Sequence, residues 1–367
     1  MENRFTKKIE ERIYKNILEK KLFNKKDILI VSVSGGPDST FLLYILNKFN
    51  IKYDFNLKIN VIHLNHMLRE EADSDEEFVK KLCLKLSIPF YSKKVDINKK
   101  SKEEALSIEL AGRKARKDFV KEVEEKLLKE NNLNDENEIK IVYGHHADDV
   151  VETFIFNAVR GASLEGLSSI KEQNKNVVRP ILFLHKEEIL KYLKQLDIPY
   201  VIDKTNYENT YNRNKIRNVV ISYLEENIND KASYNIYNAV ENLRDINDYL
   251  NKICLDKLNL LLKELSLKEK DEFETEENIK SKLNKKSIKK IEYMNLNEIK
   301  VLDDVLIKNI VSLIVKDIKI NSGIIEDIFS LIKNNRGNKY IDISNICFLN
   351  KNKKIYIIYF EDINDRN

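Results

Sequence analysis

The stretch DILIVSVSGGPDS, from Asp27 to Ser39, decides the fold of this chain. Five of the seven residues from Ile28 to Ser34 are apolar, which is typical of a short buried strand. The strand runs into the turn SGGPDS and then into an apolar helical run, FLLYIL, at 41–46. A glycine-rich turn between a strand and a helix can bind phosphate, because the first N–H groups of the helix have no partner within it and the helix dipole is positive there. Two adjacent glycines let the backbone approach the anion closely.

The rest of the first half repeats this alternation of strand and helix. After a helix over 5–22 and the opening strand, we predict strands over 57–64, 88–95 and 139–144 and helices over 74–87, 102–130 and 145–160. Such alternation predicts right-handed βαβ units and an α/β fold with a doubly wound parallel sheet of the Rossmann type. The polar clusters at 34–39, 63–69 and 144–152 each follow a predicted strand. They are therefore expected at the carboxyl edge of the sheet, where such sheets bind ligands.

The second half is mainly helical and ends in strands. Helices are predicted over 185–196, 212–227, 232–264, 298–317 and 322–334, and strands over 339–348 and 353–360 form a hairpin around 350–352. The charged stretch 265–290 is a linker or a solvated helix. We therefore expect a nucleotide-binding catalytic domain over 1–228, a helical domain with a charged linker over 229–295, and a small α+β module over 296–367.

Composition sets only broad limits on function. The 367 residues carry 64 basic and 60 acidic side chains, and this net charge of +4 is too small to indicate nucleic acid by itself. No run of about 18 apolar residues occurs, so no membrane span is expected. Cys83, Cys254 and Cys347 form no CxxC pair and are expected to be core thiols of a cytoplasmic protein.

The loop at 34–39 differs from a Walker A loop, because it lacks the GxxxxGK[ST] pattern. The lysine of a Walker loop serves chemistry at the γ-phosphate. SGGPDS resembles instead the PP-loop of ATP pyrophosphatases, which release pyrophosphate and leave AMP on an acceptor. Ser34 and Ser39 would donate hydrogen bonds to phosphate oxygens, and Asp38 would help to hold a Mg²⁺ ion. An ordinary glycine turn with a capping Asp is the alternative.

The segment HHADDVVE, at 145–152, forms the second chemical cluster. Asp149 and Glu152 share one face of the predicted helix, because they are three residues apart. Two such carboxylates can bind Mg²⁺ or an ammonium group, and His146 can polarise a substrate oxygen or take a proton. A zinc site is not expected, since no third soft ligand is evident. A solvated acidic helix N-terminus is the alternative.

Four segments together resemble the tRNA(Ile)-lysidine synthetase family in order and spacing. They are SGGPDS, HLNHMLR at 63–69, SIELAGRKAR at 107–116 and GHHADDVVETFIFNAVRGASLEGLSSI at 144–170, and they are extended by RPIL at 179–182 and DKTNYENTYNRNKIRN at 203–218. The resemblance implies ligation of L-lysine to C2 of the wobble cytidine of tRNA(Ile) with a CAU anticodon, with ATP split to AMP and pyrophosphate. The lysidine formed changes codon reading from AUG to AUA and the identity of the tRNA from Met to Ile.

The resemblance also implies a role for each matching residue. ATP is bound by Ser34, Gly35, Gly36, Pro37, Asp38, Ser39, His66 and Arg116. Catalysis involves Asp38, Arg113, His146, Asp149 and Glu152, of which Asp149 and Glu152 also bind lysine. The tRNA substrate contacts Arg213, Asn214 and Arg217, near Asn206, and the C-terminal module binds tRNA as well. A homodimer is an open alternative to a monomer.

Three residues depart from the family pattern. Met67 stands where the family commonly has Gly, which predicts a bulkier turn, while Lys117 replaces a frequent aromatic residue and Lys215 a frequent Arg. None of these departures removes a candidate catalytic group.

Two other classes of function stay open on the sequence alone. A related PP-loop enzyme could carry out tRNA thiolation or amide ligation, although thiolation needs paired cysteines for sulfur or a cluster and none is evident. A non-catalytic RNA-binding scaffold with a vestigial nucleotide site would keep every function after Asp38→Ala.

Overall fold

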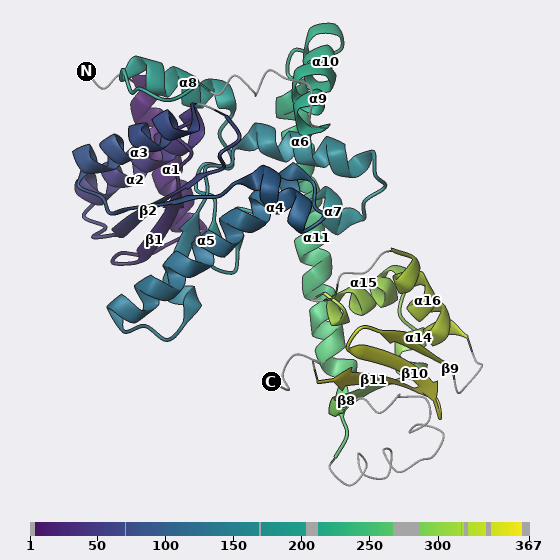
Figure 1. Cartoon of the computed structure of the whole chain (residues 1–367). Helices are drawn as coiled ribbons and strands as arrows, with labels where there is room; N and C mark the ends of the chain where they lie inside the picture. Colours follow the sequence, from purple (N-terminus) through teal and green to yellow (C-terminus); the bar gives the residue numbers. More distant parts are fainter. Residues whose placement is uncertain are drawn as a thin grey trace. The chain divides into compact units, whose positions relative to one another are not determined.

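The computed structural model describes residues 4–69, 71–168, 170–202, 212–266, 287–316, 318, 322–334 and 339–361 (Figure 1). It contains two compact units, residues 1–241 and 242–367. The three-domain division expected from the sequence, with boundaries at 228 and 295, stays a prediction.

A six-stranded sheet forms the centre of the first unit, in the order β3-β2-β1-β4-β6-β5. The parallel strands are β1 (Ile28–Ser32), β2 (Lys58–Asn65), β3 (Phe90–Lys94), β4 (Ile139–Val142) and β6 (Val177–Val178), and β5 (Gln173–Asn174) pairs antiparallel with β6. The predicted parallel sheet is thus confirmed. Because β2 and β4 lie on opposite sides of β1, the strand order reverses at β1, and the carboxyl ends of β1 and β4 flank a topological switch point.

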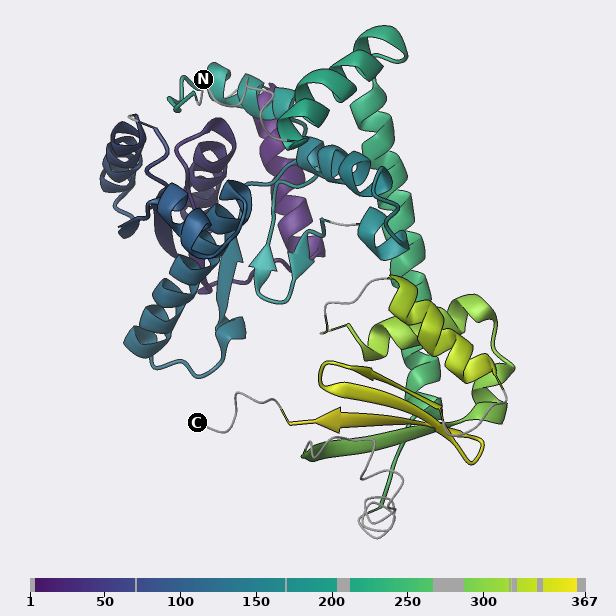
Figure 2. The ribbon, with the colours of Figure 1, turned by 45° about the vertical axis from the view of Figure 1, so that its right-hand side comes forward.

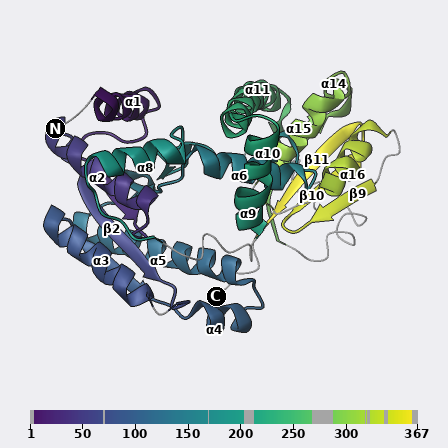
Figure 3. The same cartoon turned by 90° about the horizontal axis from the view of Figure 1, so that it is seen from above.

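Alternate residues of β1 face opposite sides of the sheet and bury against different helices. Leu29 and Val31 pack in one core with α1 (Arg4–Glu19), α2 (Pro37–Lys52), α3 (Ala72–Leu86) and α8 (Lys186–Gln195). Ile28 and Ile30 pack in another core with α5 (Ile108–Asn131). Figure 3 shows α1 and α5 on opposite sides of β2. The continuous apolar run of β1 therefore reflects burial on both faces.

Further helices follow β4 and β6 along the chain. They are α6 (Ala147–Ala158), α7 (Leu164–Leu167) and α8, then α9 (Asn212–Lys215), the π-helical segment η3 (Ile216–Ile221), α10 (Ser222–Asn227) and α11 (Ala232–Leu261). The predicted helix 212–227 is present as the run α9–η3–α10. Residues 203–211, which include Asn206, lie outside the described part of the chain.

The second unit contains a five-stranded antiparallel sheet in the order β7-β8-β11-β10-β9. Its strands are β7 (Lys263–Glu264), β8 (Ile288–Asn295), β9 (Lys339–Ile343), β10 (Ile346–Lys351) and β11 (Lys354–Phe360). α14 (Leu296–Lys300), α15 (Asp304–Ile314) and α16 (Ser322–Lys333) lie on one face (Figure 2). The end of α11 shares their core through Cys254 and Leu258.

Several predicted elements were wrong in detail. The expected helix 102–130 is two helices, α4 (Ile97–Glu103) and α5, since Ala105 takes a left-handed φ of 52° and the Ser107 hydroxyl caps α5 by accepting from Leu110 N. The expected helix 298–317 divides into α14 and α15. The expected strand 339–348 is β9 and β10, which turn at Ser344, and the next hairpin turns at Asn352 and Lys353, both with positive φ. β8 was missed, and residues 267–286 of the charged stretch lie outside the described part.

Among the described helices, none has the length and apolar character that crossing a bilayer requires.

Candidate active site

The ends of β1 and β4 come into close contact because residue 144 has no side chain. A Cβ atom on Gly144 would lie 3.2 Å from both the carbonyl carbon and the oxygen of Asp38, and 3.3 Å from Ser39 Cα. The segment after β4 therefore runs directly against the first turn of α2. This contact joins the first polar cluster of the sequence to the second.

The phosphate loop is folded on its own hydroxyl groups. Ser39 Oγ accepts from Ser34 N at 3.2 Å and donates to Gly36 O at 3.2 Å, and the two serine Oγ atoms are 3.2 Å apart. Gly35 has a φ of +90°, a conformation that favours glycine. Pro37 begins α2, where the missing N–H group costs no helical hydrogen bond. The loop thus places both hydroxyl groups beside the N-terminus of α2, and their predicted hydrogen bonds to phosphate oxygens stay a prediction.

Asp38 is paired with a residue that the sequence did not single out. Lys186 Nζ donates to Asp38 Oδ1 at 2.6 Å and to Oδ2 at 2.7 Å, and Lys186 N donates to Asp148 Oδ2 at 2.8 Å. Ala147 N also donates to Leu184 O at 2.8 Å. The N-termini of α2, α6 and α8 therefore converge on one place, and all three present positive dipole ends to it.

His146 lies between the phosphate loop and the carboxylates of α6. Its ring is 3% exposed, with Nδ1 3.1 Å from Asp148 Oδ2 and Nε2 3.7 Å from Asp38 Oδ2, and its backbone N–H donates to Asp149 Oδ2 at 2.9 Å. Burial lowers the pKa of His146, but Asp149, Asp148 and Asp38 outweigh it and raise the pKa to about 9. The ring is therefore cationic near neutral pH. It can donate to a substrate oxygen, whereas the alternative of accepting a proton is disfavoured in this state.

The two neighbouring carboxylates stay ionised for the same reason. Burial alone would raise the pKa values of Asp148 and Asp149, but contacts with the histidines, above all His146, hold both well below the usual range. His146 and these acids thus form one coupled group with a net negative charge.

His145 belongs to the site although the sequence assigned it no role. Burial lowers its pKa to about 4, Asp149 opposes this shift and Arg179 adds to it. Its Nδ1 accepts from Arg179 Nε at 3.2 Å, which leaves the proton of the neutral ring on Nε2. The sequence offered one indication of this contact: Arg179 belongs to the RPIL segment of the resemblance and had no role assigned to it.

Glu152 is fully buried and bound by two arginines. Arg213 Nε donates to Glu152 Oε2 at 2.9 Å, Arg217 Nε donates to Glu152 Oε1 at 2.5 Å, and Arg213 Nη2 lies 3.4 Å from Asp149 Oδ1. Glu152 raises the pKa of Arg217 against the lowering effect of burial. The structure thus brings together the carboxylates expected to bind lysine and the arginines expected to contact tRNA. In this state the two groups form ion pairs with each other. Asn214, on α9, is half-buried and lies between Arg213 and Arg217 in the sequence.

His66 and the two arginines of α5 form a separate group beside β2. Arg116 Nη2 donates to His66 Nε2 at 3.3 Å, and burial together with the charge of Arg116 lowers the pKa of His66 to about 4. Arg113, one turn earlier on α5, is exposed, and its charge acts on Arg116. Met67 takes a φ of 52°, which agrees with the glycine that the resemblance leads one to expect there. No described contact joins this group to Asp38.

The site fits Mg²⁺ through a single carboxylate. Among the residues that the structure describes, no three His, Cys, Asp or Glu side chains gather as a metal-binding group. Mg²⁺ in proteins is often bound by one or two carboxylates together with substrate phosphates and water. Asp38 fits this mode once Lys186 releases one of its oxygens.

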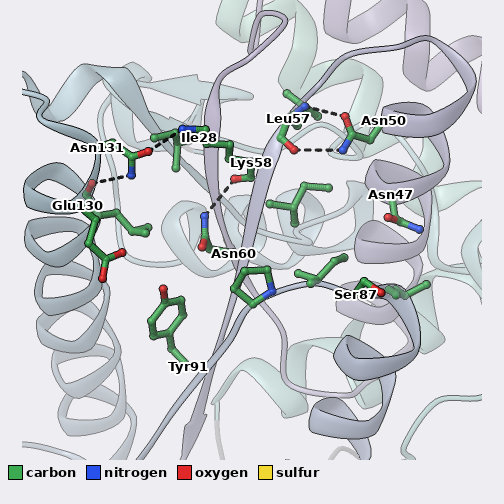
Figure 4. A pocket seen from close by; sticks show the side chains of 15 residues that line it. Ile28, Asn47, Asn50, Leu57, Lys58, Asn60, Ser87, Tyr91, Glu130 and Asn131 are labelled. Atoms are coloured by element: carbon green, nitrogen blue, oxygen red, sulfur yellow. Dashed lines mark hydrogen bonds between the residues drawn. The ribbon is translucent and has the colours of Figure 1, made fainter.

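A hollow of about 470 Å³ lies at the other end of the strands (Figure 4). It is lined by the starts of β1 and β2 and by the turn that precedes β3. Three of its four asparagines are paired within the fold: Asn50 bonds both backbone groups of Leu57, Asn60 donates to Lys58 O, and Asn131 donates to Leu127 O. The hollow is therefore not part of the candidate active site.

Comparisons with known proteins identify the family of this chain. A model of the PP-loop domain family matches residues 1–224. A tRNA(Ile)-lysidine synthase from Caldanaerobacter subterraneus subsp. tengcongensis is 40% identical over 250 residues, which cover 68% of this chain and 51% of that protein. The chain thus spans about half the length of this relative. A tRNA(Ile)-lysidine synthase from Clostridioides difficile (strain 630) is 32% identical over 363 residues, which cover 97% of this chain and 71% of that protein.

A solved structure shows the same fold at low sequence identity. It is the U34-tRNA thiolase NcsA from Methanococcus maripaludis with its [4Fe-4S] cluster, with a TM-score of 0.51, 18% identity, and coverage of 65% of this chain and 78% of that chain. This likeness concerns the fold alone. The family model covers more than half of the chain and the Clostridioides relative matches nearly all of it, so the chain belongs to the tRNA(Ile)-lysidine synthase family of PP-loop proteins.

Proposed function

We propose that the chain ligates L-lysine to C2 of the wobble cytidine of tRNA(Ile) with a CAU anticodon and converts ATP to AMP and pyrophosphate. The observation that carries the proposal is the contact of the two predicted clusters, with His146 Nε2 3.7 Å from Asp38 Oδ2. A phosphate loop on one side and an acid–histidine cluster on the other can serve one adenylated intermediate. The names of the relatives, both tRNA(Ile)-lysidine synthases, support this choice of substrate.

In the first step the C2 oxygen of cytidine attacks the α-phosphorus of ATP. The new O–P bond replaces the bond to the bridging oxygen, and pyrophosphate leaves with the electron pair. The N-terminus of α2 and the hydroxyls of Ser34 and Ser39 stabilise the phosphate oxygens, and the cationic His146 adds positive charge beside Asp38. Mg²⁺, when bound with ATP at Asp38, supplies further neutralisation of phosphate charge.

In the second step the ε-amine of lysine attacks C2 and the C2–O bond breaks, which releases AMP. Asp149 and Glu152 are the carboxylates that orient the amine in this proposal. Because Arg213 and Arg217 now occupy them, lysine must exchange with these arginines. The released guanidinium groups can then bind the carboxylate of lysine or a phosphate of the tRNA.

The decisive experiment mixes the protein with ATP, labelled lysine and a tRNA(Ile) transcript with a CAU anticodon. We expect label in the tRNA, one AMP per lysine, and no label when the wobble cytidine is replaced by uridine. Absence of label, while a known lysidine synthase is active in the same mixture, contradicts the proposal.

The positions of the three cysteines argue against tRNA thiolation. Cys83 is buried in the core of the first unit, and Cys254 and Cys347 are buried in the second. None lies among the site residues, so the site offers no thiolate for sulfur transfer or a cluster. When lysine is omitted, tRNA-dependent pyrophosphate turnover that still yields a modified base would favour this alternative. Full function of Asp38→Ala would favour the other alternative, a non-catalytic RNA-binding scaffold.

Contact of the C-terminal unit with tRNA, a homodimer and a cytoplasmic location stay predictions.

A further inference from the structure

Lys186 reaches the phosphate loop from 148 residues further along the chain. Its ammonium group bonds both oxygens of Asp38, at 2.6 and 2.7 Å. The side chain is 34% exposed and that of Asp38 is 27% exposed, so the pair faces the open side of the loop. A ligand that enters the loop therefore meets this ion pair.

The backbone of Lys186 is fixed, while its ammonium group is on a flexible stem. Lys186 N donates to Asp148 Oδ2 at 2.8 Å, and the preceding residue is held because His185 N donates to Glu188 Oε2 at 3.1 Å. A lysine side chain has four rotatable carbons beyond this anchor. The ammonium group can therefore leave Asp38 without any movement of α8.

Charge gives a reason for such a movement. The loop SGGPDS contains no lysine, and Asp38 adds a negative charge at the place where a triphosphate would bind. An unpaired carboxylate would repel phosphate, whereas an ammonium group shared between the two attracts it. The positive N-terminus of α8 adds to this effect.

We propose that Lys186 is a phosphate-binding residue that supplies from α8 the ammonium group missing from the loop. Before ATP binds, it neutralises Asp38. When ATP binds, the ammonium group moves to an oxygen of the β- or γ-phosphate, frees one oxygen of Asp38, and stays with the pyrophosphate as it leaves. This inference rests on the proposed use of ATP.

The test measures binding of the magnesium complex of α,β-methylene-ATP to the full chain by calorimetry, without tRNA or lysine. We expect Lys186→Met to weaken binding at least about tenfold, since a charged hydrogen bond is lost. Lys186→Arg should recover most of the affinity. Lys194→Met, which removes an exposed lysine of the same helix, should bind as the wild type does. A change of less than about twofold for Lys186→Met overturns the proposal. Lys186→Gln is the second neutral variant, in case the methionine prevents folding.

A double-mutant cycle separates direct phosphate contact from mere support of Asp38. If Lys186 binds phosphate, Lys186→Met weakens analogue binding at least about fivefold even in the Asp38→Asn protein. If it acts only through Asp38, it has no further effect in that background, and the proposal is wrong. Binding of the analogue is independent of lysidine formation. Loss of lysidine synthesis with intact Lys186-dependent binding would contradict the proposed function alone.

Discussion

Glu152 is a buried carboxylate that positions two arginines of this site, Arg213 and Arg217. It is fully buried, yet it carries two guanidinium partners that are each about 40% exposed. A buried charge of this kind is retained only when it is fully paired. Its surroundings therefore favour a cationic ligand.

We expect Glu152→Gln to lower lysine incorporation about 100-fold. Arg213 and Arg217 lose the anion that pairs with them, and the ε-amine of the substrate lysine loses the carboxylate proposed to bind it. The free energy of unfolding should fall by about 1–3 kcal/mol. The measurements are label incorporation and urea unfolding. Glu125→Gln is the control, because Glu125 is exposed and its carboxylate lies 3.9 Å from the ammonium group of exposed Lys121. Undiminished incorporation by Glu152→Gln would remove Glu152 from the lysine site.

The raised pKa of His146 makes stability depend on pH. The folded protein binds this proton more tightly than the unfolded chain, with a pKa of about 9 against an ordinary 6.5. The stabilisation is therefore complete below pH 6.5 and is lost as the pH rises through 9, by at most about 3 kcal/mol. His145 and His66, with pKa values lowered to about 4, act in the opposite sense, and their contribution is lost as the pH falls from 6.5 towards 4.

We expect the free energy of unfolding to decline between pH 6.5 and 9.5, and to decline less in His146→Gln. Urea unfolding at several pH values measures this, and the Cε1–H resonances report each histidine directly. An equal decline in both proteins would show that His146 is not the responsible group.

Those residues of this site that belong to a recognisable short motif could be predicted from the sequence. SGGPDS and HHADDVVE are such patterns, and the structure brings both to the switch point. Lys186 could not be found in this way, because a lysine at the start of a helix is common and its partner Asp38 is distant in sequence. The pairing of Asp149 and Glu152, the carboxylates proposed to bind lysine, with arginines also depends on tertiary packing.

At the level of elements, the apolar parallel strands of the first sheet were predictable, whereas the breaks between helices and the strand β8 were not. The apolar strands of the first sheet are buried on both faces, so their composition indicates them directly. The break between α4 and α5 falls in SKEEALS, which contains no Gly or Pro, and it depends on the φ of Ala105 and the cap at Ser107. β8 was missed because Lys289, Lys290 and Glu292 hide its alternation.

Gly144 controls how closely the segment after β4 approaches α2. In Gly144→Ala the new Cβ would lie 3.2 Å from backbone atoms of Asp38, so the two elements must separate by a few tenths of an ångström. We expect a KM for ATP several-fold higher, because the added methyl group displaces the phosphate loop directly. The KM for lysine should be less affected.

Steady-state kinetics with each substrate varied in turn checks this. Gly161→Asn is the control, since no atom lies within 4 Å of that Cβ and Asn tolerates its φ of +70°. An unchanged KM for ATP would show that the loop adapts to the added methyl group.

The whole molecule contains separate hydrophobic cores in its two units. α11 contributes Tyr237 and Val240 to a core of the first unit and Cys254 and Leu258 to the core of the second. All the site residues discussed above lie in the first unit. A ligand of the phosphate loop should therefore stabilise one unit directly and leave the other without a contact of its own.

We expect scanning calorimetry of the full chain to show two transitions, of which only one rises with the magnesium complex of α,β-methylene-ATP. At a ligand concentration 100 times Kd the gain is about 2.7 kcal/mol, which corresponds to a rise of roughly 5–10 °C for a unit of this size. Asp38→Asn removes the carboxylate that is proposed to bind Mg²⁺, so it should bind the magnesium complex more weakly and show a smaller rise of the same transition. A single transition would mean that α11 couples the two cores strongly enough for them to unfold together. An equal rise of two transitions would contradict the expectation that the ligand stabilises only the first unit.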